Sequence, residues 1–224
     1  PGEFHQDFGD RLRTYEELNL EGQTQPQMHG NAVASIAAGR DCGVAPEAEI
    51  HYIATWIGGT GADGRDFTNL ARGIRRILEI NGELPDDRKI RVISASVGWS
   101  PSEKAYDDVS AAAAEAKAAG LLFVSSSIEQ VHGFKFQALG RAPMADPDQF
   151  ESYEPGMFWA KSFFTGARFT DRLLVPMDSR TTVSPTGPKD YVFYRHGGWS
   201  WAAPYIAGLY ALAAQTDTAI TPER

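Results

Sequence analysis

The order of apolar and polar positions along the chain predicts strands and helices in alternation. Across residues 66–80, apolar side chains recur three or four positions apart, and an Asn-Gly pair then stops the pattern, as in an amphipathic helix. Short apolar runs at 50–54, 91–96 and 121–124 have the length and the composition of strands. The sequence therefore predicts three strands, with the helix at 66–80 between the first and the second.

Two more helices are predicted nearer the end of the chain. Residues 102–119 pass through an alanine-rich stretch and stop at Gly120, and residues 200–215 carry Pro204 in their first turn, where proline is tolerated. Residues 131–190 are rich in Pro, Gly and aromatic residues and are predicted to form loops and short strands. The β-α-β-α order predicts an α/β fold with a parallel sheet and helices on both faces.

Composition narrows the class of protein. A chain of 224 residues with 42% hydrophobic and 22% charged residues is expected to form one globular domain. The formal charge of −8, without a run of Lys or Arg, argues against nucleic acid or a membrane surface as partners. A single cysteine, Cys42, excludes an internal disulfide and fits a reducing compartment such as the bacterial cytoplasm.

Three motifs stand out. The first is Met-His-Gly-Asn-Ala-Val-Ala-Ser-Ile at 28–36, with Gly-Val-Ala-Pro at 43–46; the second is Ile-Ser-Ala-Ser-Val-Gly at 93–98; the third is Gly-Trp-Ser-Trp-Ala-Ala-Pro-Tyr-Ile-Ala-Gly at 198–208. In this order they resemble the histidine helix, the cleft strand and the serine helix of subtilisin-like serine proteases, the subtilase family. The resemblance implies a three-layer subtilisin-like fold with a mostly parallel central sheet, and one catalytic domain over residues 1–224.

The resemblance makes His29 the general base and Ser200 the nucleophile of a serine endopeptidase. A serine hydroxyl is a weak nucleophile until a neighbouring base takes its proton, and the amides at a helix start can stabilise an oxyanion. No cofactor is implied. A peptide or protein substrate is expected to add as a strand beside two segments, which consist of Ser96, Val97, Gly98, Ser125, Ser126 and Ser127.

One departure from the family pattern concerns the oxyanion site. Glu129 falls where the family places an asparagine, and an ionised carboxylate there would repel the tetrahedral intermediate. A protonated carboxyl could donate a hydrogen bond instead, or Gln130 could reach the site if the register shifts by one residue. Glu129 could also point away and leave the backbone amides to act alone.

A second departure concerns the third catalytic residue. The family has a strand ending in aspartate upstream of the histidine, and the stretch around Asp7 and Asp10 resembles the segment that follows that strand. We therefore expect a fragment truncated at its N-terminus, and possibly at its C-terminus, with the aspartate outside it. A separate segment could supply the missing strand. Asp7 or Asp10 acting in its place is the alternative.

Two other functions compete with proteolysis. A pseudoprotease would hold peptides in the same cleft without cutting them efficiently, as Glu129 would favour. A nucleotide-binding protein is disfavoured, because the glycines at 58–64 are not followed by Lys-Ser/Thr.

The remaining candidate residues carry weaker expectations. Cys42 is expected to be buried and slow to react. No metal motif such as His-Glu-x-x-His occurs. The possible ligands for a structural calcium ion do not form a recognisable calcium loop, and they are Asp63, Asp66, Asp146 and Asp148.

Overall fold

The computed structural model describes residues 4–18, 27–57, 64–155 and 171–223. Its first half contains η1 (Gly9–Arg11), β1 (Leu12–Leu18), α1 (Met28–Ala38), β2 (Ile50–Thr55), α2 (Thr68–Glu83), η2 (Asp86–Arg88), β3 (Val92–Ala95), α3 (Tyr106–Ala118) and β4 (Leu122–Ser125). Its second half contains α4 (Ile128–His132), β5 (Lys135–Arg141), η3 (Phe150–Ser152), β6 (Tyr153–Pro155), β7 (Arg172–Pro176), β8 (Arg180–Val183), β9 (Tyr191–Tyr194) and α6 (Trp199–Thr216).

The mostly parallel central sheet that was expected is not seen in the residues that the structure describes. In the described residues, β1 pairs with β2 and β3 pairs with β4, both in parallel, but β2 and β3 are not paired with each other. A mixed sheet of order β6-β5-β7 and the antiparallel pair β8-β9 complete the set. The α/β character is therefore confirmed, whereas a continuous sheet is absent from the described part of the chain.

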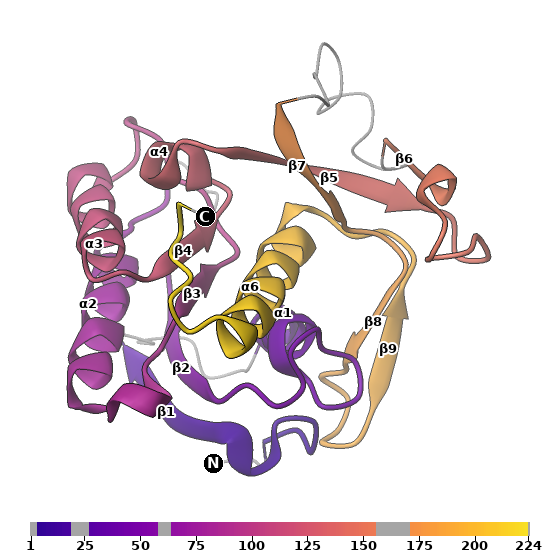
Figure 1. Ribbon diagram of the computed structural model, residues 1–224, viewed down its shortest axis with the longest axis horizontal. Coiled ribbons are helices and arrows are strands. Elements are labelled where there is room, and N and C mark those ends of the chain that lie inside the picture. Colours follow the sequence, from indigo (N-terminus) through magenta and orange to yellow (C-terminus); the bar gives the residue numbers. More distant parts are fainter. Residues whose placement is uncertain (1–3, 19–26, 58–63, 156–170, 224) are drawn as a thin grey trace.

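One helical layer covers the strands on the side of α2 and α3, at the left of Figure 1. The apolar stripe predicted from the sequence forms α2, and its Ile74 is buried against a core that includes Phe67, Trp99 and Phe123. The helix runs to Glu83, slightly beyond the predicted stop. Through this core, one face of β3 and β4 packs against α2 and α3.

The second layer consists of α1 and α6, which pack against each other. A Cβ at Gly208 of α6 would come within 2.6 Å of the Val44 side chain and 2.8 Å of the Ala37 carbonyl oxygen, so glycine permits this close approach. Ile206 of α6 is buried among apolar side chains of β4 and β7. Helix α6 thus joins the first half of the molecule to the second.

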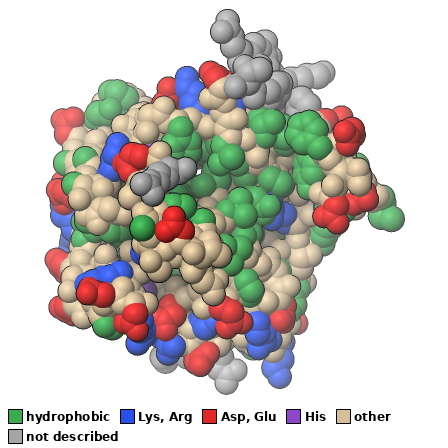
Figure 2. Space-filling model, viewed as in Figure 1, with side chains coloured by type: hydrophobic (Ala, Val, Ile, Leu, Met, Phe, Trp, Pro, Cys, Tyr) green, Lys and Arg blue, Asp and Glu red, His purple; other side chains and the backbone are tan. Residues whose placement is uncertain are grey.

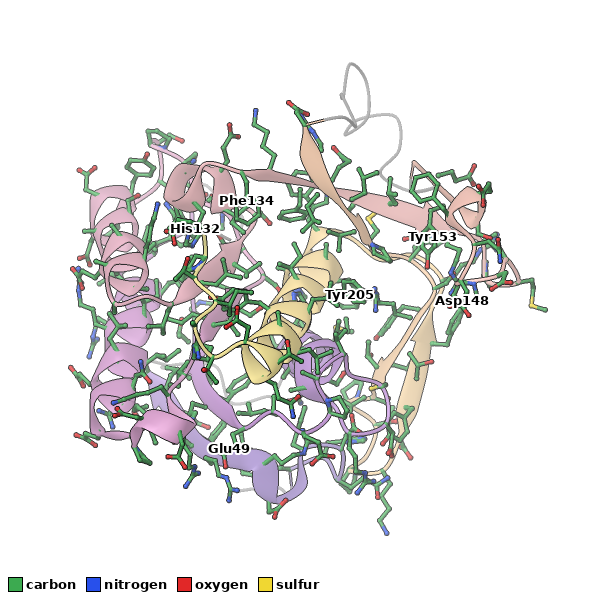
Figure 3. The ribbon with its side chains drawn as sticks, viewed as in Figure 1. Glu49, His132, Phe134, Asp148, Tyr153 and Tyr205 are labelled. Atoms are coloured by element: carbon green, nitrogen blue, oxygen red, sulfur yellow. The ribbon has the colours of Figure 1, made fainter. Side chains whose placement is uncertain are left out.

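The second half spreads outward from α6, with β5 and β7 above it and the β8-β9 hairpin beside it (Figure 1). Hydrophobic side chains gather over α6 and toward β5 and β7 on the face shown in Figure 2. Leu173 of β7 and Leu209 and Leu212 of α6 are exposed. Tyr205 projects from α6 toward the hairpin (Figure 3), where the guanidinium carbon of Arg180 lies 4.3 Å from the centre of its ring. Within the described residues, no helix has the length and apolarity needed to span a membrane.

Candidate active site

His29 and Ser200 occupy the first turns of the two packed helices. His29 is the second residue of α1 and Ser200 the second residue of α6. The aromatic rings of His29 and Trp201 lie 5.7 Å apart, centre to centre. The packing of α1 against α6 therefore brings the predicted base and nucleophile to the same end of the helix pair.

This end lies at the carboxyl ends of β2 and β3. Arg11, next to the start of β1 and β2, donates to the carbonyl of Ala38 at 2.6 Å, which places the end of α1 there. Arg91, just before β3, donates to the carbonyl of Thr218 at 3.0 Å, which places the end of α6 beside the start of β3. The opposite ends of both helices, with the predicted base and nucleophile, consequently sit where β2 and β3 finish.

The Ser200 side chain is bonded to the residue that follows β3. Its Oγ donates to the carbonyl oxygen of Ser96 at 3.4 Å, while Ser96 Oγ donates to the Ser200 carbonyl at 2.9 Å. Across the described residues, no hydrogen bond joins His29 to Ser200. No side chain caps the start of α6, where the Trp201 amide donates to the Gly198 carbonyl at 2.9 Å. The Ser200 amide, in the same turn, is placed to serve an oxyanion.

The His29 imidazole is exposed at the helix start, yet partial desolvation by its neighbours lowers its pKa below the ordinary value. The neutral imidazole is thereby favoured at neutral pH, as a general base requires. Tyr52 of β2 reaches up to the same turn, and a Cβ at Gly30 would collide with the Tyr52 hydroxyl. A residue larger than glycine at position 30 would therefore displace Tyr52. The sequence motif did not reveal this contact between α1 and β2.

Asp7 lies at the far end of α1 and cannot orient His29. Its carboxylate is fully buried against Gly39, ten residues beyond His29, and an α-helix rises about 1.5 Å per residue, so roughly 15 Å separates them. The Asp7 Oδ1 atom accepts hydrogen bonds from the Asp41 amide at 2.9 Å and the Tyr191 hydroxyl at 2.8 Å. Asp7 therefore has a structural role, as a buried acceptor of hydrogen bonds. The sequence alone did not distinguish this role from that of a catalytic aspartate.

Asp10, the other candidate for the third catalytic position, lies exposed in η1, just before β1. The start of β1 is next to the start of β2, which is the opposite end from the predicted nucleophile. Neither aspartate of the N-terminal segment is therefore placed to complete a triad.

Glu129 and Gln130 lie exposed in the short helix α4. The carboxylate of Glu129 is 3.0 Å from the ammonium of Lys135 at the start of β5. The Glu129 carboxylate is therefore engaged by a cation at the surface of the molecule.

The two predicted substrate segments run side by side. The Ser126 amide donates to the Val97 carbonyl at 3.0 Å, and Ser127 Oγ accepts from the Trp99 amide at 3.0 Å. Ser125 and Ser127 are buried, whereas Ser96, Val97 and Gly98 are half-buried. The segments that follow β3 and β4 are thus locked together close to the start of α6.

Cys42 is half-buried rather than buried, and its thiol donates to Asp7 Oδ2 at 3.4 Å. Burial and the neighbouring carboxylate raise its pKa to about 12.

The acids considered for calcium do not gather into one site. Asp66 is 2.7 Å from the Lys104 ammonium, and Asp146 accepts from the Asp148 amide at 2.9 Å. Asp63 lies outside the described residues. In the part of the chain that the structure describes, no group of three His, Cys, Asp or Glu side chains could hold a metal ion.

Solved structures of similar fold include the A subunit of the AB5 toxin from E. coli, with a TM-score of 0.66 and 18% identity over 97% of this chain and 76% of that one. A structure of the subtilase cytotoxin SubAB assembly has a TM-score of 0.64 and 17% identity, over 96% of this chain and 73% of that one. The prenylagaramide maturation protease PagA has a TM-score of 0.60 and 18% identity, over 98% of this chain and 75% of that one. No curated protein matched in sequence. The sequence profile of the subtilase family, peptidase S8, matches residues 10–153, and the chain therefore belongs to the subtilase family.

Proposed function

We propose that this chain is the catalytic part of a serine endopeptidase in which Ser200 is the nucleophile and His29 the general base. The observation that carries the proposal is the meeting of two helix starts, one with the histidine and one with the serine, at the carboxyl ends of β2 and β3. Membership in a protease family supports the same reaction class.

The chemistry follows from these positions. Ser200 Oγ attacks the carbonyl carbon of the scissile peptide bond while His29 takes the hydroxyl proton, and His29 then gives that proton to the leaving amine. Water cleaves the resulting ester in the reverse order of proton transfers and returns the serine. The long bond from Ser200 Oγ to Ser96 must break first, which a rotation about one side-chain torsion accomplishes.

Substrate binding and oxyanion stabilisation are assigned to backbone groups. A peptide would add as a strand beside 96–98 and 125–127, which lie together near the α6 start. The Ser200 amide in the first turn of α6 would donate to the oxyanion, since Glu129 is exposed and paired with Lys135.

Labelling with a fluorophosphonate tests the proposal, because covalent attachment at a serine requires an activated hydroxyl. We expect the full chain to be labelled on the peptide that contains Ser200, with labelling abolished by Ser200→Ala and reduced at least tenfold by His29→Gln. Labelling that survives Ser200→Ala, or that ignores the His29 substitution, contradicts the proposal.

A pseudoprotease is the second candidate, favoured by the hydrogen bond of Ser200 to Ser96 instead of to His29. It predicts peptide binding without fluorophosphonate labelling. Glu129→Gln separates the two oxyanion hypotheses: the exposed, ion-paired carboxylate predicts a labelling rate within about twofold of the parent, whereas a tenfold change would assign Glu129 to the oxyanion site.

A further inference from the structure

Ser200 lies inside the first turn of α6, and different groups hold the two ends of that turn. The Trp201 amide closes the turn on the Gly198 carbonyl. Trp201 is buried, and its ring packs against the rings of His29 and Tyr194. One end of the turn is therefore anchored by aromatic packing, and the exact place of Ser200 depends on how the chain enters the helix at the other end.

The chain enters this turn through Gly197, which is held by the segment that follows β7. The Gly197 amide donates to Asp178 Oδ1 at 2.6 Å, a short bond of the kind expected when the acceptor is a carboxylate. A Cβ at position 197 would collide with the Met177 carbonyl oxygen and would lie 3.0 Å from the Trp201 side chain. Glycine is therefore needed at this position, because the chain passes directly against the end of β7.

Asp178 belongs to the turn between β7 and β8, which passes beside the start of α6 (Figure 1), and it is only 4% exposed. The next residue, Ser179, has a φ of 54°, in the left-handed region that residues other than glycine seldom adopt. The Ser179 amide donates to the Arg195 carbonyl at 3.2 Å, and Ser179 Oγ donates to the Arg141 carbonyl at 2.7 Å. The Arg141 guanidinium in turn donates to the Ser179 carbonyl at 3.3 Å. These bonds fix the turn and thereby the direction of the Asp178 carboxylate.

We propose that Asp178 is a positioning residue of the active site, whose carboxylate holds Gly197 and thereby sets the place of the Ser200 hydroxyl and amide. This inference rests on the proposed function, because Asp178 acts through the nucleophile. The attacking hydroxyl and the amide that faces the oxyanion belong to the same residue, so a shift of the turn displaces both. A displacement of about 1 Å at reacting groups can lower a rate on the order of 10²-fold.

Two substitutions separate the position of the Asp178 carboxylate from its charge. Asp178→Asn keeps the length of the side chain and an acceptor oxygen for the Gly197 amide, but it removes the charge. Asp178→Glu keeps the charge, but it adds a methylene group to a buried side chain and so displaces the turn. A positioning role therefore predicts that the Asn variant works, and that the Glu variant is impaired like Asp178→Ala.

Fluorophosphonate labelling of Ser200 in the full chain, measured over a range of reagent concentrations, gives the maximal rate constant and the half-saturating concentration separately. We expect the maximal rate constant to fall about tenfold or more in the Ala and Glu variants and to stay within about threefold of the parent in the Asn variant. The half-saturating concentration should stay within about twofold in all three. Normal labelling of the Glu variant with slow labelling of the Asn variant would assign the effect to charge and overturn the proposal.

Hydrogen exchange of the Gly197 amide, followed by NMR, tests the bond to Asp178 independently of catalysis. Exchange should accelerate about tenfold or more in Asp178→Ala and stay within about threefold of the parent in Asp178→Asn, while the amides of α2 are unchanged. Unchanged exchange at Gly197 in the Ala variant overturns the proposal, whatever the labelling. If the parent is not labelled at Ser200, the proposed function fails, and the exchange rates alone decide whether Asp178 holds the turn.

Asp217→Ala supplies a matched control at the other end of α6. The Asp217 carboxylate also accepts a backbone amide, that of Ala219 at 3.0 Å, but it is exposed and follows the last turn of the helix. This variant should speed exchange at Ala219, leave Gly197 unchanged and keep the labelling rate within about twofold of the parent. An equal loss of labelling in Asp217→Ala and Asp178→Ala would show a general loosening of α6 and overturn the proposal.

Discussion

Removing the Asp7 carboxylate should destabilise the fold strongly. The side chain is fully buried, and it accepts hydrogen bonds from the Asp41 amide, the Tyr191 hydroxyl and the Cys42 thiol. Hydrogen bonds to a charged acceptor contribute about 1.5–3 kcal/mol each, and a buried donor left without a partner costs about 1–3 kcal/mol. With the thiol bond counted as weak, Asp7→Ala should lower the free energy of unfolding by about 3–5 kcal/mol.

Urea denaturation followed by tryptophan fluorescence measures this loss. Asp7→Asn keeps an acceptor of the same shape and should cost about 1–2 kcal/mol, whereas Asp10→Asn, on an exposed residue, should stay within about 0.5 kcal/mol of the parent. The Asn variant should also retain fluorophosphonate labelling at Ser200. A decrease in the free energy of unfolding below about 1 kcal/mol for Asp7→Ala would refute the structural role of the Asp7 carboxylate. Loss of labelling in a stably folded Asp7→Asn protein would instead return Asp7 to the catalytic machinery.

Three further outcomes are expected. His132, labelled in Figure 3, accepts a β4 backbone amide through Nε2 at 3.0 Å, and burial, aided by a nearby lysine, lowers its pKa. Its contribution to stability is therefore complete above the unfolded pKa of about 6.5 and is lost as the pH falls through the lower folded pKa. Urea midpoints measured from pH 7.5 to 5 should fall less steeply for His132→Gln, and parallel curves would contradict this. Cys42, whose pKa is about 12, should react with a thiol reagent at pH 8 far more slowly in the native protein than in urea; rapid stoichiometric modification would show otherwise. Gly208→Ala, which forces a Cβ against a backbone carbonyl, should cost about 1–3 kcal/mol and reduce Ser200 labelling, while Gly82→Ala, with open space around it, should be neutral or stabilising by up to about 1 kcal/mol. Equal unfolding free energies of the two glycine variants would refute the close approach of α1 and α6.

Elements with strong apolar periodicity could be predicted from the sequence. The ranges of α2, β3, β4 and α6 agree with the predicted segments to within a few residues, because each buries a continuous apolar face. Strand β1 was missed. Its charged residues, including Arg13 and Glu16, obscure the pattern in a strand that is paired only with β2 in the described residues and is half-exposed.

The site was predictable only where local motifs carry it. The helix starts at His29 and Ser200 follow from motifs that combine a reactive residue with small neighbours. The role of Asp7 depends on Tyr191, 184 positions away in sequence, which no local pattern encodes. The lack of pairing between β2 and β3 in the described residues could not be read from the apolar runs, because each run predicts a strand but not its neighbour.

The bonds around Asp7 also constrain the order of folding. Besides the Tyr191 bond, the Gln6 amide donates to the Pro188 carbonyl at 2.8 Å, so the segment around Asp7 is fixed by residues that the ribosome adds much later. At about 5–20 residues per second, a ribosome needs on the order of 10–40 s to extend the chain that far. During that interval the segment lacks its final partners, so the side chains of His5, Asp7 and Phe8, which are buried in the folded protein, stay accessible to solvent.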